Sequence, residues 1–206
     1  HERRCIMAII QGNAKQGSTR GFYPKVINGS LRFNKDDASL LTLTPDSAGS
    51  RTTWTYSAWV KLSVLPSSSA NDTFLLTSAS GSTETTTYIN GINGRIEFYH
   101  YNGSGFDFIL KTNNFLRDPS AWYHLVIVMD TTNATAANRQ RIYINGVAVT
   151  SWDTQSNSSQ NFANGLINNT TAQNIGGFNG TGKFDGYMAN VHFIDGQALT
   201  ASDFGE

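Results

Sequence analysis

Apolar and polar residues alternate with a period of two through most of the chain after Ser30, and this pattern predicts β-strands. The clearest case is the segment 52–62, in which Trp54, Tyr56, Ala58 and Val60 fall on one face. The segment 123–129 is instead apolar at almost every position, which is typical of a strand covered on both faces. Further strands are predicted at residues 30–33, 40–43, 74–77, 85–89, 95–101, 106–110, 141–144, 147–149, 173–175, 186–188 and 189–193.

Turn-forming dipeptides separate these strands. Asn90-Gly91, Asn93-Gly94, Asn102-Gly103 and Asn145-Gly146 are typical of tight hairpins. Strand signals recur at intervals of roughly 8–12 residues, as in sandwiches. Only the segment 199–204 is predicted to be helical, with Thr200 as its cap. The sequence therefore predicts an all-β fold made of two antiparallel sheets.

The first part of the chain lacks this periodicity. We expect residues 1–29 to form an extended N-terminal arm, and residues 30–206 to form one domain. Met7 reads as a natural start with residues in front of it, so residues 1–6 are left out of the fold prediction. The sequence leaves open whether the arm is a flexible tail or an ordered segment used in assembly.

Composition and charge exclude several classes of partner. The 15 basic residues balance the 15 acidic residues, so the chain lacks the net charge that attracts nucleic acids or acidic membranes. We therefore expect no nucleic-acid partner. The single cysteine, Cys5, cannot form an intramolecular disulfide. No apolar run approaches the 18 residues of a membrane span.

Several motifs in the second half of the chain occur in a recognisable order. They are Ala121–Val128 (AWYHLVIV) followed by Asp130, then Arg141–Gly146 (RIYING), Ile175–Gly177 (IGG), Phe184–Val191 (FDGYMANV) and Ala198–Thr200 (ALT). Their order and spacing resemble the laminin-G-like, concanavalin-A-like lectin jelly rolls. This resemblance covers residues 52–206 and implies a jelly-roll sandwich.

A narrower resemblance covers residues 21–62. Its segments are Gly21–Tyr23, Ser30–Asn34, Thr44-Pro45, Ala48-Gly49, Arg51–Thr55, Ser57 and Trp59–Lys61. They resemble jelly-roll proteins of tailed bacteriophages that occur on the virion surface, in tail fibres or as other surface components.

The phage resemblance implies a non-enzymatic virion surface protein, used in capsid decoration or in a tail fibre. Such a protein is made in the host cytoplasm and then carried on the virion surface. Its expected partners are other virion proteins and a host-surface glycan, and by analogy we expect a homo-oligomer such as a trimer. The alternative is a free carbohydrate-binding lectin module with calcium at its rim.

The sequence lacks the motifs of the hydrolytic enzymes that share this fold. Glycoside hydrolysis needs two carboxylates about 5–5.5 Å apart in retaining enzymes. The glucanases of the superfamily carry them as Glu-x-Asp-x-(x)-Glu, and this string does not occur here. A Gly-x-Ser-x-Gly motif is also absent. His124 and His192 lie in predicted strands among apolar neighbours, as structural histidines do, so we expect no enzyme.

A glycan site is predicted on a polar strand face. Glu97, Tyr99 and Tyr101 alternate with apolar residues, and Arg141 and Tyr143 do the same in a later strand. Such a face could stack sugar rings on its aromatic side chains and bind their hydroxyls. Trp152 and Phe178 lie in polar loops, where we expect exposed aromatic rings at the rim. The alternative is that these are ordinary strand residues.

A calcium site is implied by the resemblance, since laminin-G-like domains often hold calcium at one rim. The candidate oxygen ligands are Asp72, Asp130 and Asp185, because carboxylates suit a hard cation. The alternative is that these aspartates fill turns by bonding to the local backbone.

Overall fold

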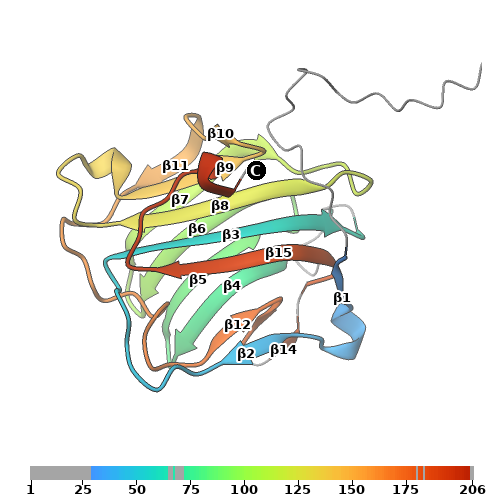
Figure 1. Ribbon diagram of the computed structural model, residues 1–206, viewed down its shortest axis with the longest axis horizontal. Helices are drawn as coiled ribbons and strands as arrows, with labels where there is room; N and C mark the ends of the chain where they lie inside the picture. The colour runs from blue at the N-terminus through green and yellow to red at the C-terminus, as the bar shows by residue number, and fades with distance from the viewer. Residues whose placement is uncertain (1–28, 65–66, 68–71, 180, 183, 205–206) are drawn as a thin grey trace, which may run out of the picture.

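Two antiparallel sheets face one another across a shared apolar core (Figure 1). The computed structural model describes residues 29–64, 67, 72–179, 181–182 and 184–204. The predicted two-sheet antiparallel sandwich is therefore confirmed, whereas residues 1–28 of the predicted arm lie outside the described residues. Among the helices described, none is long and apolar enough to cross a membrane.

The strands divide unevenly between the two sheets. In spatial order, the six-stranded sheet contains β1 (Leu31–Phe33), β15 (Gly186–Asp195), β3 (Thr53–Leu62), β8 (Tyr123–Asp130), β9 (Gln140–Ile144) and β10 (Val147–Ala148). The seven-stranded sheet contains β11 (Trp152–Ser156), β7 (Phe106–Phe115), β6 (Arg95–Asn102), β5 (Thr83–Ile89), β4 (Thr73–Ser80), β12 (Gln173–Ile175) and β2 (Leu41–Leu43). A separate short ladder pairs β13 (Gly177–Phe178) with β14 (Thr181–Gly182). The described residues also form the 3₁₀ helices η1 (Lys35–Asp37), η3 (Ala136–Asn138) and η4 (Ala201–Phe204).

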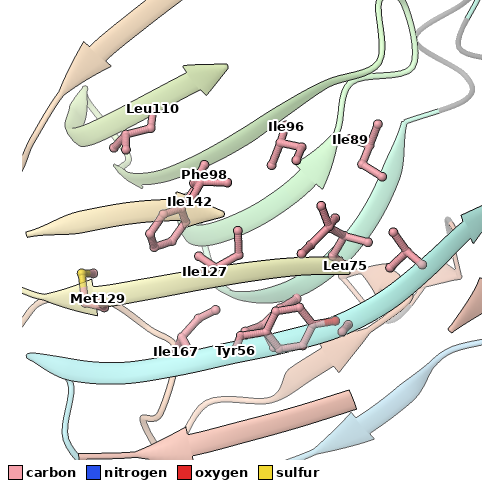
Figure 2. Packing of buried hydrophobic residues seen from close by; sticks show 14 of the residues in the cluster. Tyr56, Leu75, Ile89, Ile96, Phe98, Leu110, Ile127, Met129, Ile142 and Ile167 are labelled. Carbon is pink, nitrogen blue, oxygen red and sulfur yellow. The ribbon is translucent and has the colours of Figure 1, made fainter. Parts of the chain in front are cut away.

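The core forms where the inner faces of the two sheets meet. Trp54, Tyr56, Ala58 and Val60 of β3 are all at most 1% exposed, so the predicted apolar face of this strand is confirmed. Figure 2 shows side chains from both sheets in this cluster. The ring of Trp54 meets that of Phe98, from the opposite sheet, edge to face with centroids 5.7 Å apart.

Strand β8 is covered on both faces, as its apolar sequence predicts. Leu125, Ile127 and Met129 face the main core, whereas Val126 and Val128 pack on the other side against Ala201 of η4. The C-terminal segment is therefore helical as predicted, although as a 3₁₀ helix. The backbone N–H of Thr200 donates to the carboxylate of Asp203 over 2.7 Å and closes the first turn of η4. The 3₁₀ helix thus covers part of the outer face of the six-stranded sheet.

The Asn145-Gly146 dipeptide forms the hairpin turn that its sequence predicts. Both residues have positive φ, 48° and 83°, which suits the mirror-image turns that join twisted strands. This turn connects β9 to β10 at the edge of the six-stranded sheet.

Close packing of two strands gives a test of the register. Gly186 of β15 lies opposite Leu62 of β3, and a Cβ atom there would overlap the backbone carbonyl of Lys61. Gly186→Ala should therefore lower the free energy of unfolding in urea by about 1–3 kcal/mol, as overpacking does. Gly105→Ala is the matched control, because nothing lies within 4 Å of its added Cβ. Equal stability of the two variants would contradict the close approach of β15 to β3.

Candidate functional site

A continuous row of six aromatic rings crosses the outer face of the seven-stranded sheet and ends on the short β13–β14 ladder beside it. The rings, in order, are Phe178, Phe74, Tyr88, Tyr99, Phe106 and Tyr101, and we call them the aromatic row. Adjacent ring centroids lie between 5.1 and 6.2 Å apart, which is contact distance for stacked and edge-on pairs. The rings come from β13, β4, β5, β6 and β7, so the row joins five strands.

Strand alternation places these rings outside the core. In β6 the inward side chains Ile96 and Phe98 are fully buried, and Tyr99 and Tyr101 point to the other face. The rings of the row are half-buried except that of Phe106, which is 52% exposed. The structure thus brings together four of the predicted glycan residues: Glu97, Tyr99, Tyr101 and Phe178.

Polar groups border the aromatic row. The hydroxyl of Tyr99 donates to Oε1 of Glu84 over 2.5 Å. The Glu97 carboxylate is buried and accepts from Nδ2 of Asn90 at 2.8 Å, while Nζ of Lys111 lies 3.2 Å from its other oxygen. These contacts hold the polar side chains in fixed positions, so hydrogen-bonding groups of defined orientation lie beside the aromatic rings.

Two tyrosines of the row keep their protons. Burial, followed by the nearby carboxylate of Glu97, raises the pKa of Tyr88. Burial and the hydrogen bond to Glu84 raise the pKa of Tyr99. Both side chains therefore remain neutral phenols at any physiological pH.

The prediction that Arg141 and Tyr143 share this face is wrong. Both belong to β9, which is part of the six-stranded sheet, so they lie on the opposite side of the sandwich. Nη1 of Arg141 donates to the Tyr143 hydroxyl over 3.3 Å, and Tyr143 packs against the small core beneath η4. The alternating pattern identifies the outward residues of a strand, but it does not say which sheet the strand joins.

The prediction that Trp152 is an exposed loop residue is also wrong. Trp152 begins β11 and pairs with Thr112, whose side chain faces inward, so the indole packs against the main core. Trp152 and Arg141 both line a pocket of about 340 Å³ at the edge of the sandwich. Phe178 is likewise no free rim residue, since it stacks on Phe74 in the aromatic row.

The candidate calcium ligands are each engaged in a separate contact. Oδ1 of Asp72 accepts from the backbone N–H of Gly91 at 2.6 Å. Asp130 accepts from the hydroxyl of Thr132 at 2.7 Å, and Asp185 forms an ion pair with Arg32 at 2.7 Å.

No calcium site is assembled from these three aspartates. Within the part of the chain that the structure describes, no three His, Cys, Asp or Glu side chains gather where they could hold a metal ion. The aspartates therefore do not fit the calcium site that the resemblance implies. Asp72 and Asp185 instead hold segments that are distant in the chain, and of the three only Asp130 bonds to a near neighbour, as the turn alternative expects.

The two glutamates beside the aromatic row belong to neighbouring strands. Glu84 of β5 lies opposite Tyr101 of β6, and Glu97 is four residues earlier on β6. Four residues of strand span about 13 Å, so the two side chains leave the sheet at well-separated positions.

Sequence reasoning missed Phe74, Tyr88 and Phe106. A β-bulge between Phe74 and Leu76 breaks the alternation of β4, so Phe74 faces outward although Leu75 and Leu76 are both buried. β5 carries threonines on both faces, so its sequence has no apolar–polar alternation that would predict the face on which Tyr88 lies. The remaining signal is the dense aromatic content of the segment 98–108.

A second group of polar side chains lies on the outer face of the six-stranded sheet. Oγ of Ser57 and Nε2 of His124 are 2.7 Å apart in a pocket of about 330 Å³. His124 is buried, as expected for a structural histidine, whereas His192 in the same pocket is exposed. Burial, followed by the nearby His192, lowers the pKa of His124 to about 4, so its ring is neutral near pH 7.

The fold and its polar aromatic face define a lectin-like β-sandwich. The family described as the concanavalin A-like lectin/glucanases superfamily matches residues 34–203, and the chain belongs to that family. None of the curated proteins matches the chain.

Solved structures share this fold at low sequence identity. CBM40 of the Ruminococcus gnavus IT-sialidase, bound to α2,3-sialyllactose, has a TM-score of 0.56 at 13% identity, over 86% of this chain and 95% of that one. Domain 4 of AbnA, an extracellular arabinanase of Geobacillus stearothermophilus in complex with arabinotriose, has a TM-score of 0.54 at 16% identity, over 87% and 89%. The heptameric SAP-like pentraxin of Limulus polyphemus has a TM-score of 0.51 at 16% identity, over 89% and 78%.

The buried His124 predicts how stability depends on pH. Its pKa is about 4 in the folded protein, against an ordinary value of 6.5. As the pH falls below 6.5, the unfolded chain binds a proton that the folded chain does not yet accept. The free energy of unfolding should therefore fall by on the order of 3 kcal/mol between pH 6.5 and 4 through this group.

His124→Gln keeps a hydrogen-bonding side chain beside Ser57 but removes the titrating group. Urea denaturation at a series of pH values should show a shallower loss of stability for this variant than for the wild type. His192→Gln should change the pH slope less than His124→Gln does, because His192 is exposed and acts here only through its smaller effect on the pKa of His124. The same pH slope in His124→Gln and the wild type would contradict the assignment.

Proposed function

We propose that the outer face of the seven-stranded sheet binds a carbohydrate without cleaving it. The observation that carries this proposal is the aromatic row, which offers six adjoining rings beside fixed polar groups. The apolar faces of sugar rings stack on aromatic side chains, and their hydroxyls bind to oriented polar groups. A half-buried row spread over five strands suits an extended oligosaccharide better than a single sugar.

The family and its structural relatives support the ligand class. The chain belongs to a lectin and glucanase superfamily, and two similar structures carry a bound oligosaccharide, arabinotriose in one and sialyllactose in the other. A carbohydrate-binding module is therefore better supported than the virion protein that the narrower resemblance implies. The expected virion location, virion partners and trimer stay predictions, since no structure described above is a phage protein.

The charges beside the row favour a neutral sugar. Lys111 forms an ion pair with Glu97, and Arg95 forms one with Asp153, so the nearby cations already have anionic partners. Glu84 adds a carboxylate next to Tyr99. An acidic sugar would be repelled by this carboxylate, whereas a neutral sugar can donate hydroxyl hydrogen bonds to it.

Replacing two rings of the row tests the site. Tyr101→Ser combined with Phe106→Ser should weaken binding of a neutral oligosaccharide by about tenfold or more, because the sugar loses stacking worth roughly 1.4 kcal/mol or more. Isothermal titration calorimetry with arabinotriose and a panel of other neutral oligosaccharides measures the loss. Sialyllactose should bind more weakly than the best neutral sugar.

Tyr187→Ser is the control variant. Tyr187 is 36% exposed on β15, in the other sheet, and its loss should leave sugar affinity unchanged. Unchanged affinity in the double variant, or equal losses in the double variant and the control, would overturn the proposed site. Release of reducing sugar from any member of the panel would overturn the non-enzymatic reading.

A further inference from the structure

The pocket on the outer face of the six-stranded sheet has a lining that the carbohydrate proposal does not use. It is the pocket of about 330 Å³ that contains Ser57 and His124, and we call it the outer-face pocket. Its walls come from β3, β8, β15 and the segment 199–204, whose helix η4 lies over β8 and β9 (Figure 1). The hydroxyl of Thr55 donates to the carbonyl of Gln197 and accepts from the N–H of Leu199. These bonds fix the C-terminal wall of the pocket against the sheet.

A β-bulge in β15 directs polar side chains to this pocket. The register shifts between Ala189 and His192, so β15 has one residue more than β3 at this point. Met188 before the shift and Val191 after it both pack in or against the core, which leaves His192 on the outer face. Asn190 has a φ of 46°, a left-handed conformation that is uncommon for residues other than glycine. Asn190 and His192 are both exposed, and both line the pocket.

Aromatic and apolar side chains form another part of the wall. The ring of Trp59 stacks on that of His124 with centroids 5.2 Å apart. Trp59, Leu199 and Phe204 are half-buried, so part of each side chain remains accessible. Ser57 and His124 are buried and bond to one another, so a ligand in the pocket meets the more exposed groups around them.

Asp203 supplies the negative charge of the outer-face pocket. One of its oxygens, Oδ2, accepts from the backbone N–H and the hydroxyl of Thr200 at 2.7 and 2.9 Å, as the last residue of a capping box does. The other oxygen, Oδ1, has no partner among the described residues. These hydrogen bonds from Thr200 lower the pKa of the Asp203 carboxyl, which is therefore ionised near pH 7. The described residues that line the pocket include no lysine or arginine.

We propose that the outer-face pocket binds a small aliphatic amine in its protonated form. The ammonium group donates a charge-assisted hydrogen bond to Oδ1 of Asp203 and a second one to the amide oxygen of Asn190. The apolar part of the amine packs on the accessible parts of Trp59, Leu199 and Phe204, where a cation is also attracted to the aromatic faces.

Charge and size select this class of ligand. An anion is repelled by Asp203 and finds no lysine or arginine among the described lining residues. The volume of about 330 Å³ lies at the lower end of the range for ligand pockets, roughly 300–1,000 Å³, and so suits a small molecule. The pocket and the aromatic row lie on opposite sides of the sandwich, so this proposal does not rest on the carbohydrate site.

Three probes that share one ring and differ in charge test the proposal. Cyclohexylammonium is a cation, cyclohexanol is neutral and cyclohexanecarboxylate is an anion. In a ¹H–¹⁵N NMR titration at about pH 8, above the ordinary pKa of histidine, cyclohexylammonium should bind roughly threefold to tenfold more tightly than cyclohexanol. Cyclohexanecarboxylate should show no saturable binding. The shifted signals should cluster at Asn190, His192 and residues 199–204.

Asp203→Asn removes the charge and keeps an oxygen that can accept from Thr200. The affinity for cyclohexylammonium should therefore fall to that for cyclohexanol, and the affinity for cyclohexanol should stay the same. Asp46→Asn is the matched control, because it removes the same charge from an exposed residue of the loop between β2 and β3 that does not line the pocket. The control should retain the full preference for the ammonium probe.

Asn190→Gly tests the site without changing η4. Glycine adopts a positive φ without strain, so the bulge should persist and the variant should remain folded by its NMR spectrum. Loss of the amide should weaken binding of cyclohexylammonium by about threefold and leave that of cyclohexanol unchanged.

Three results would overturn the proposal. Equal affinity of the wild type for cyclohexylammonium and cyclohexanol would show that the pocket does not select a cation. A preference for the ammonium probe that survives in Asp203→Asn, or signals that shift away from the pocket, would place the cation elsewhere. Tighter binding of glucose or galactose than of cyclohexylammonium at the same signals would assign the pocket to a neutral sugar instead.

Discussion

Burial of the two inner sheet faces against each other is the constraint on which the rest of the structure depends. Edge-to-face contact of Trp54 with Phe98 joins the sheets at the centre, and apolar residues of both sheets surround it. Because successive side chains of a strand point to opposite faces, fixing the inner set also fixes the outer set. The aromatic row is held half-exposed for this reason: Tyr99 cannot turn inward without drawing Phe98 out of the core.

The two outer faces differ in what covers them. On the six-stranded sheet, η4 packs over Val126 and Val128, and the ring of Phe204 lies near His124. His124, which faces outward from this sheet, is consequently buried and is neutral near pH 7. On the seven-stranded sheet, the outward tyrosines remain accessible beside polar partners. The same alternation thus produces a packed face on one sheet and a partly exposed aromatic face on the other.

Sequence pattern predicted those features that depend on neighbouring residues. The inward face of β3, the double coverage of β8 and the Asn145-Gly146 turn all follow from local periodicity or turn chemistry, and the structure has each of them. Sheet membership is different, because it depends on pairing between distant segments. For example, β2 pairs with β12 across about 130 residues, and no local pattern specifies that choice.

The same limit explains how far the candidate site could be predicted. Alternation correctly grouped Glu97, Tyr99 and Tyr101, which share one strand. It wrongly added Arg141 and Tyr143, because the outward face of β9 belongs to the opposite sheet. It also missed Phe74, where a bulge adds one residue to β4 and changes the face that follows.

That bulge places two residues of β4 that are two apart on opposite faces of the seven-stranded sheet. Phe74 contributes a ring to the aromatic row, and Leu76 packs in the main core. In a regular strand, residues two apart point to the same face, so the two side chains could not be divided in this way. Bulges are common where a sheet must direct a side chain to a particular place, and the one in β4 has that effect here. The irregularity that breaks the periodic pattern therefore also lets Leu75 and Leu76 both pack in the core while Phe74 remains in the aromatic row.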